Sequence, residues 1–249
     1  MLASCAVEVE ATIPGTRLSR AELDAVTGYA AKATWPAGFV IYQGGTPADG
    51  VFIVLRGRVV LRSRVKAGRG YVPSIATAGE TFGAEGLAPH GSYVTDARAD
   101  DVSETLFLSG ARFRALAREQ APHALALIGQ VMSEHAQLLS KMRELATLGV
   151  EQRVVAAIAR LARHPAFLAS DGRVVLEPAL YRLLCELVGA TRESVTLVLN
   201  RLVAQGLVER RGADLLVTRD LARRADEPWH EGETPISVSG DQRSGHLAR

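Results

Sequence analysis

The stretch "GATRESVTLVLNRL", residues 189–202, has the pattern of a helix with one apolar face. Thr191 stands where its hydroxyl can cap the first turn, and Gly206 stands where such a helix commonly ends. Apolar residues recur at helical spacing and predict a stripe that packs on the rest of the chain: Val195, Val198 or Leu199, and Leu202. The other face carries Arg192, Glu193, Thr196, Leu197, Asn200 and Arg201. Such a face fits an ordinary solvated helix as well, so the neighbouring sequence has to decide its role.

The segments on either side of this helix predict a winged helix-turn-helix. Residues 178–189, "PALYRLLCELVG", have the pattern of a helix with proline in its first turn, and only a short turn separates it from the next helix. Residues 207–218, "LVERRGADLLVT", predict two short strands around Arg211 to Asp214. The second helix of this motif enters the major groove of DNA. We therefore expect the following DNA-contacting residues: Thr191, Arg192, Glu193, Thr196, Leu197, Asn200, Arg201, Arg210 and Arg211.

The charge of the chain supports this assignment only mildly. The formal net charge is +2, which does not identify a nucleic-acid-binding protein by itself. Residues 190–224 contain seven arginines and four acidic residues, so this segment alone carries an excess of three positive charges. Such a local excess is typical of a surface that faces phosphates.

Upstream, residues 34–109 have the texture of antiparallel β-structure. Short runs rich in Val, Ile, Tyr and Phe alternate with glycine turns, as in "GFVIYQGG" and "GVFIVLRGRVVLRSRV". This pattern predicts a β-sandwich or barrel, with a hairpin around Gly68 and Gly70. A short helix is expected over residues 20–33.

Residues 110–164 change to a helical pattern, with a long helix at about 122–147. Six residues of this helix follow a 3-4 spacing: Ile128, Val131, His135, Leu138, Met142 and Leu145. The spacing predicts a coiled-coil seam between two copies of the chain. A helix that packs its apolar face inside one monomer is the alternative that this pattern leaves open.

Composition limits the remaining possibilities. The 249 residues, 47% of them hydrophobic, suffice for two domains, and no run of eighteen apolar residues predicts a membrane span. The start of the chain lacks the basic region of a signal peptide, and the two cysteines, Cys5 and Cys185, are not spaced as a metal-binding pair. We therefore expect a cytoplasmic protein without membrane association and without a bound metal. The six histidines are scattered, and no series of nucleophile, base and acid predicts an enzyme.

Together these segments resemble the Crp/Fnr family of bacterial transcription regulators. The resemblance covers about residues 20–222 and rests on "GATRESVTLVLNRL" with "GLVERRG", "GVFIVLRGRVVL" and "GETFGAEGL". It implies an α+β chain with an N-terminal extension (1–19), a cyclic-nucleotide-binding-like β-roll (20–121), a dimerisation helix (122–148), a winged helix-turn-helix (149–225) and a disordered tail (226–249). It also implies double-stranded DNA, a second copy of the chain and RNA polymerase as partners.

In the recognition helix the family pattern is only partly present. Arg192 and Glu193 match the Arg and Glu with which relatives contact bases, and these side chains suit guanine and cytosine respectively. The arginine that relatives often place four residues after the glutamate is Leu197 here. One base contact that is common in the family is therefore expected to be absent, so the operator sequence cannot be copied from relatives.

The effector pocket departs further from the family pattern. In relatives that bind cyclic nucleotides, a Glu after the "FG" turn contacts the ribose, an Arg-Ser pair holds the phosphate, and a Thr-Ser pair on the long helix contacts the adenine. The candidate pocket residues here are Gly83, Ala84, Glu85, Tyr93, Val94, Leu138 and Leu139. None of them supplies a cation for the phosphate, and burying an unpaired phosphate is costly. We expect no required cofactor and no binding of cyclic AMP in the usual manner; a sensor module whose DNA binding depends on an effector is the alternative.

Overall fold

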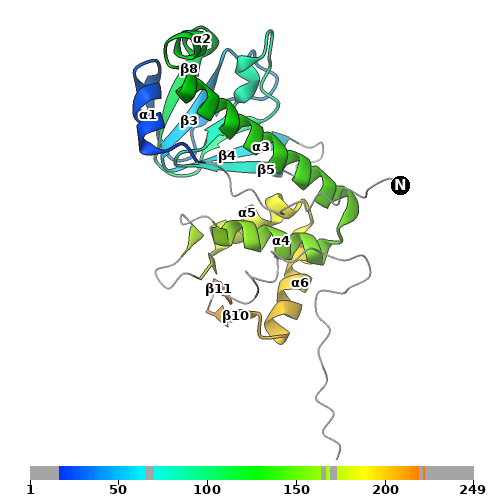
Figure 1. The fold of residues 1–249 in the computed structure, drawn as a ribbon. Coiled ribbons are helices and arrows are strands. Elements are labelled where there is room, and N and C mark those ends of the chain that lie inside the picture. The colour runs from blue at the N-terminus through cyan, green and yellow to red at the C-terminus, as the bar shows by residue number, and fades with distance from the viewer. Residues whose placement is uncertain are drawn as a thin grey trace, which may run out of the picture.

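The N-terminal half of the chain forms a β-roll from two four-stranded antiparallel sheets (Figure 1). The structure, a computed structural model, describes residues 17–64, 70–163, 167–168, 173–212, 214–218 and 221. One sheet has the order β1-β8-β3-β6 and the other β2-β7-β4-β5. The strands are β1 (Ala31–Trp35), β2 (Val40–Tyr42), β3 (Gly50–Arg56), β4 (Arg58–Arg64), β5 (Gly70–Thr77), β6 (Thr81–Phe82), β7 (Asp96–Ala99) and β8 (Ser103–Ser109), with a short 3-10 helix, η1 (Ala84–Leu87), after β6.

Six α-helices among the described residues flank or follow the roll. They are α1 (Arg20–Thr27), α2 (Gly110–Glu119), α3 (Ala121–Thr147), α4 (Val150–Arg163), α5 (Pro178–Val188) and α6 (Arg192–Ala204). A three-stranded antiparallel sheet, in the order β10-β11-β9, completes the C-terminal part with β9 (Val175–Leu176), β10 (Val208–Arg211) and β11 (Asp214–Val217). The predicted α+β class, with a β-roll, a long helix and a winged helix-turn-helix, is confirmed.

One sequence expectation is only partly correct, and several others fall outside the described residues. The helix expected over residues 20–33 is wrong in its second half, because α1 ends at Thr27 and residues 31–35 pair with β8 as strand β1. The β-sheet partner is far away in sequence, so the local pattern did not reveal it. The Gly68 turn, Cys5, the first sixteen residues and the tail 226–249 lie outside the described residues.

The alternation of strand β3 separates two cores of the roll. Val51 and Ile53 point outward and pack with residues of α1, α2 and α3, among them Leu116 and Leu127. Phe52, next to them in the chain, points into the roll and packs with Tyr42, Phe82, Tyr93 and other interior residues. This period of two is expected of a strand that is buried on both faces.

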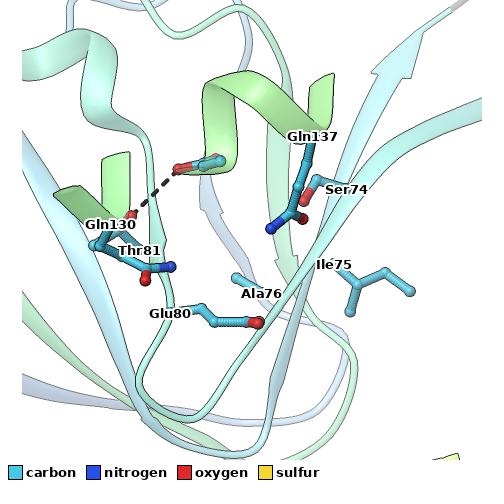
Figure 2. Close-up of a pocket in the computed structure, with 8 residues that line it drawn as sticks. Ser74, Ile75, Ala76, Glu80, Thr81, Gln130 and Gln137 are labelled. Atoms are coloured by element: carbon cyan, nitrogen blue, oxygen red, sulfur yellow. Dashed lines mark hydrogen bonds between the residues drawn. The ribbon is translucent and has the colours of Figure 1, made fainter. Parts of the chain in front are cut away.

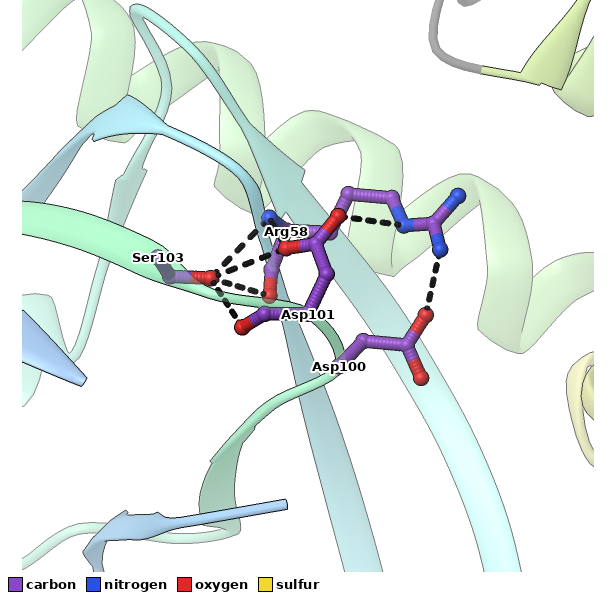
Figure 3. Close-up of polar contacts among 4 residues, drawn as sticks. All are labelled: Arg58, Asp100, Asp101 and Ser103. Atoms are coloured by element: carbon purple, nitrogen blue, oxygen red, sulfur yellow. Dashed lines mark hydrogen bonds and ion pairs between the residues drawn. The ribbon is translucent and has the colours of Figure 1, made fainter. Parts of the chain in front are cut away.

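A tight turn between β3 and β4 is held by a polar cluster (Figure 3). Gly57 has φ +81°, and a Cβ there would lie 2.6 Å from both Asp101 Oδ1 and Ser103 Oγ, which excludes other residues. The Arg58 backbone N–H donates to Asp101 Oδ1 at 2.8 Å, and the Arg58 guanidinium pairs with Asp100 at 2.8 Å. The same guanidinium lies over the ring of Phe167, 5.1 Å from its centroid, so the turn also contacts the C-terminal part.

The β-roll packs directly on the C-terminal domain. Val60 and Val72 of β4 and β5 belong to the same buried cluster as residues of α4, α5 and α6. Arg62 of β4 forms an ion pair with Glu186 of α5 at 2.7 Å. Helix α5, which precedes α6, is therefore in contact with the roll. Among the described residues, no helix is long and apolar enough to cross a membrane.

Lys141, a buried lysine in the last third of α3, predicts a pH-dependent stability. The side chain is buried, with a relative exposure of 6%. This burial, and to a smaller extent the positive charge of Arg160, lowers its pKa from 10.5 to about 7. The charge of Glu144 opposes this shift, and the charge of Arg153 adds to it. Because the folded pKa lies below the unfolded one, the native chain binds fewer protons between these values. The free energy of unfolding should therefore rise with pH from about 7 to 10.5.

We expect Lys141→Met to flatten this slope and to stabilise the chain near neutral pH. Urea unfolding of both proteins between about pH 6 and 9 measures the slope directly. Lys32→Met, at a lysine on β1 whose side chain is 57% exposed, is the matched control and should keep the slope of the unmodified chain. An unchanged slope in Lys141→Met would contradict the expectation.

Candidate DNA-binding surface and effector region

The expected recognition helix, α6, is capped and oriented as its sequence predicts. Thr191 is the N-cap, and its hydroxyl accepts a hydrogen bond from the Ser194 backbone N–H at 3.3 Å. The apolar stripe Val195, Val198, Leu199 and Leu202 is buried in the C-terminal core. All nine expected DNA contacts are exposed: Thr191, Arg192, Glu193, Thr196, Leu197, Asn200, Arg201, Arg210 and Arg211. Leu197 is 63% exposed, so it does not serve the core.

Tyr181 of α5, which was not among the predicted site residues, orients the start of this helix. Its hydroxyl lies 2.6 Å from Thr196 Oγ1, which itself donates to the Arg192 carbonyl at 2.7 Å. The Arg192 guanidinium lies over the Tyr181 ring, 5.6 Å from the centroid. A tyrosine inside an apolar helix pattern looks like a core residue, and only the crossing of α5 and α6 shows that it faces Arg192.

We expect Tyr181→Phe to weaken operator binding about 2- to 10-fold, the loss of one hydrogen bond of about 0.5–1.5 kcal/mol. The ring that lies under Arg192 remains in this variant, so a larger loss is expected for Tyr181→Ala. Fluorescence anisotropy with labelled operator DNA measures both. Equal affinities of all three proteins would show that Tyr181 does not position the helix.

Polar contacts also connect α6 with its surroundings. Arg210 Nη2 of the wing donates to Asn200 Oδ1 at 3.1 Å, which joins β10 to the recognition helix. Arg201 pairs with Glu151 of α4 at 3.4 Å. Arg211 follows Arg210 on β10 and is exposed. The wing arginines and the α6 face therefore belong to one continuous surface.

Glu193 is held in its charged form at the start of α6. The pKa of its carboxyl is lowered by hydrogen bonds from its own backbone N–H and from the Thr191 hydroxyl. The positive charge of Arg192 lowers this pKa further, to a smaller extent. The free N–H groups of a first helical turn favour a negative charge there. A carboxylate in this position is an acceptor suited to the amino group of cytosine.

The expected effector residues divide between the interior of the roll and its surface. Tyr93 is 5% exposed and stacks on Tyr42 with ring centroids 3.7 Å apart; burial, followed by the charges of Asp49 and Glu85, raises its pKa to about 12. Gly83 has φ +71° and lies against both tyrosine rings, and Ala84 packs in the outer core. Val94 is 75% exposed and lines neither of the cavities described next.

The side chain of Glu85 stabilises the loop between η1 and β7. Its Oε1 accepts a hydrogen bond from the Val94 backbone N–H at 3.2 Å. Glu85, the residue that could replace the ribose-binding glutamate of relatives, therefore already accepts a hydrogen bond within the loop.

A small polar cavity lies where α3 crosses the roll (Figure 2). It measures ≈ 10 Å³, about the space that one water molecule needs. Its lining residues are Ser74, Ile75, Ala76, Glu80, Thr81, Gln130, Glu134 and Gln137, so neither Leu138 nor Leu139 belongs to it. Burial, followed by the charge of Glu85, raises the pKa of Glu134 to about 8.

This cavity was not among the sequence predictions, although the sequence contains one signal for it. Gln130, Glu134 and Gln137 are polar residues at helical spacing within an otherwise apolar helix. Their spacing places them on one face of α3. Only the packing of β5 and β6 against that face shows that they line a cavity.

A larger recess of ≈ 580 Å³ opens at the roll beside β1 and β2. Aromatic side chains dominate its wall: Trp35, Tyr42, Phe52, Tyr93 and Phe107. Asp49 is the charged residue that lines it. The recess therefore suits an uncharged or cationic ligand better than a phosphate.

The outer face of α3 carries an apolar stripe that the rest of the chain leaves exposed. Its members are Leu125, Ile128, Met132, Leu139 and Met142, with exposures of 66, 42, 58, 52 and 64%. Of the expected seam residues, Ile128, His135 and Met142 are exposed, whereas Val131, Leu138 and Leu145 are half-buried. The stripe is thus rotated slightly from the predicted seam, and Leu139 lies on it.

Comparison with known proteins agrees with this geometry. Residues 32–120 match the model of the cyclic nucleotide-binding domain, and residues 152–223 match the Crp-like helix-turn-helix domain. The β-roll and the winged helix with its exposed arginines define a DNA-binding transcription regulator. The chain belongs to the Crp/Fnr family.

Relatives with related sequences support this assignment, and a solved structure shares the fold. The transcriptional regulator SdrP of Thermus thermophilus is 29% identical over 70% of this chain and 83% of its own length. The cAMP-activated global regulator Vfr of Pseudomonas aeruginosa is 26% identical over 78% of this chain and 92% of its own length. The structure of the c-di-GMP-responsive regulator CLP of Xanthomonas campestris shares the fold, with a TM-score of 0.67, 23% identity and coverage of 80% of this chain and 99% of its own.

Proposed function

We propose that the chain acts as a homodimer that recognises a two-fold symmetric DNA sequence, with one α6 helix in the major groove of each half-site. The exposed face of α6 carries this proposal, because Arg192 and Glu193 present a guanine-binding and a cytosine-binding side chain side by side. Arg201, Arg210 and Arg211 lie around that face and suit the phosphate backbone. We propose binding, and not catalysis, as this function, carried out in the cytoplasm with DNA and RNA polymerase as the partners.

The apolar stripe on α3 supports the dimer. Leu125, Ile128, Met132, Leu139 and Met142, with the exposed His135 in the gap between Met132 and Leu139, are spaced 3, 4, 3, 4 and 3, which is the spacing of a two-stranded coiled coil. Exposed apolar groups in one continuous row favour burial against another surface. A second copy of the same helix offers a matching row.

We further propose that cyclic AMP does not activate this regulator. In this it would differ from Vfr, whose name describes it as cAMP-activated. The cavity beside α3 has ≈ 10 Å³, far below the about 300–1,000 Å³ of typical small-molecule sites. Its lining contains glutamates and glutamines but no lysine or arginine, and a buried phosphate needs such a partner. The larger recess has Asp49 at its wall, which disfavours an anion there as well.

Selection of genomic DNA fragments bound by the purified chain, with and without cyclic AMP, tests this function. We expect the same palindromic fragments in both arms and no heat of binding in a calorimetric titration with cyclic AMP. A failure to enrich any fragment would contradict sequence-specific binding. A gain in DNA affinity of about tenfold or more with cyclic AMP, equivalent to about 1.4 kcal/mol, would contradict the effector proposal.

A sensor whose DNA binding depends on another small molecule is the second candidate. The aromatic recess of ≈ 580 Å³ favours it, because the volume and lining suit a flat, uncharged ligand. This candidate predicts that the purified chain enriches fragments weakly alone and strongly after addition of a cell extract passed through a small-pore filter.

A further inference from the structure

A row of aromatic side chains inside the roll ends in an alanine on strand β1. Phe82, Phe52 and Phe107 lie opposite one another on β6, β3 and β8, and the ring centroids of the two neighbouring pairs are 5.0 and 4.8 Å apart. The next residue of this row is Ala31, directly opposite Phe107. Because a methyl group covers far less than a ring, Phe107 stays half-buried and the row opens into the recess of ≈ 580 Å³.

Strand β1 gives the recess open space at one end and a large ring at the other. Ala31, Ala33 and Trp35 alternate along the strand, so they share the face that lines the recess. Trp35 Nε1 donates to Thr105 Oγ1 at 2.9 Å, so the polar atom of the indole is already bonded within the sheet. The indole therefore contributes an aromatic surface, which attracts flat apolar groups and cations.

Asp49 adds a negative charge at the outer edge of this recess. The residue is exposed, whereas Tyr42, Phe52 and Tyr93 are 8, 8 and 5% exposed and therefore lie at the inner end. Among the described residues, no lysine, arginine or histidine forms an ion pair with the Asp49 carboxylate. A free carboxylate beside aromatic rings is complementary to an organic cation, since both attract the positive charge and the rings also attract the apolar body.

We propose that this recess binds a small organic cation of the arylalkylamine class, with its ring between Trp35 and Phe107 and its ammonium group toward Asp49. The flat, uncharged part of such a ligand matches the aromatic lining, and Asp49 adds a preference for a positive charge over none. The volume of ≈ 580 Å³ lies within the about 300–1,000 Å³ of typical small-molecule sites. The same carboxylate disfavours anions, cyclic AMP among them.

This site is separate from the small cavity beside α3, with which it shares no lining residue. The proposal names the class of ligand for the sensor described above, and it rests on that proposed function for any effect on DNA binding. Binding of the cation itself depends only on the rings and on Asp49. It can therefore be measured without DNA.

Calorimetric titration of the full chain with three probes that share a phenyl ring tests the site: phenethylamine, phenethyl alcohol and phenylpropionate. At neutral pH they carry a positive, no and a negative charge. We expect phenethylamine to bind with a Kd on the order of 10⁻³ M, as suits a ligand of this size. It should bind about two- to tenfold more tightly than the alcohol, and phenylpropionate should bind more weakly than either.

Three variants assign the binding to this recess. Asp49→Asn should lower the affinity for phenethylamine about two- to fivefold, the effect of an exposed ion pair, and leave that for the alcohol unchanged. Ala33→Phe fills the recess and should abolish binding of both probes. Asp24→Asn, at an exposed aspartate of α1 outside the recess, is the control and should bind as the unmodified chain does.

Two results would overturn the proposal. One is the absence of phenethylamine binding at millimolar concentration, or binding of phenylpropionate that is equally tight. The other is an Asp49→Asn protein that binds phenethylamine as the unmodified chain does. Circular dichroism confirms that each variant is folded, and Asp49→Asn, at an exposed residue, keeps the test decisive should Ala33→Phe not fold. Because these titrations contain no DNA, their failure leaves the DNA-binding proposal intact, and a failure to bind DNA leaves the ligand site intact.

Discussion

Leu139→Glu is expected to convert the proposed dimer into monomers and to lower the affinity for a two-half-site operator by about 10²- to 10⁴-fold, the gain that joining two binding modules typically gives. Leu139 is 52% exposed and lies in the middle of the apolar stripe on α3. In a two-fold symmetric pair of helices, the two introduced carboxylates would approach each other within an apolar seam. Both the like charge and the loss of hydration oppose association.

Sedimentation equilibrium measures the expected change in mass, and anisotropy with full and half operators measures the change in affinity. Val94→Glu introduces the same charge at an apolar residue that is 75% exposed but lies away from α3, so it should remain dimeric. A Leu139→Glu protein that sediments as a dimer would show that this face of α3 is not the interface.

Leu138→Glu distinguishes the stripe in the structure from the seam that the sequence predicts. Leu138 is half-buried against its own chain, whereas its neighbour Leu139 is exposed. We expect Leu138→Glu to lower the free energy of unfolding and Leu139→Glu to leave it nearly unchanged. Denaturation of both variants at low protein concentration makes the comparison.

The recognition helix could be predicted almost residue by residue because its signals are local. Thr191, the apolar stripe and Gly206 define its ends and its buried face within one short segment. The register of the α3 stripe was less predictable. Several apolar residues of α3 satisfy a 3-4 spacing in more than one way, and only the position of the roll decides which of them are covered.

The cavity beside α3 could not be predicted, since its wall comes from segments far apart in the chain. Gln130 and Thr81 are separated by about fifty residues and meet only because β6 runs beneath α3. Tyr181 was missed for the same reason, since its contact with Thr196 depends on how two helices cross. Departures from the family pattern at Ala84 and Tyr93 were visible in the sequence, but the stacking of Tyr93 on Tyr42 was not.

Arg192→Ala is expected to reduce affinity for the selected operator about 5- to 150-fold, or about 1–3 kcal/mol, and to relax preference at one base pair of each half-site. Arg192 is exposed at the first turn of α6, where the end of a recognition helix reaches base edges. Its guanidinium already lies over the Tyr181 ring, which limits the conformations it must give up on binding. A fork of two donors matches O6 and N7 of guanine.

Two further variants separate base reading from charge. Arg192→Lys keeps the charge but lacks the planar fork, so it should retain the salt dependence of binding while losing preference at the same base pair. Arg211→Ala removes an exposed charge on the wing and should weaken all sequences alike, lowering the slope of log affinity against log salt by about one per contact. Binding titrations on the operator, on operators changed at single base pairs and on random DNA, each at several salt concentrations, provide the comparison. If Arg192→Ala and Arg211→Ala lose equal affinity on specific and random DNA, Arg192 contacts phosphate, and the specificity of this regulator must come from Glu193 or from other exposed residues of α6.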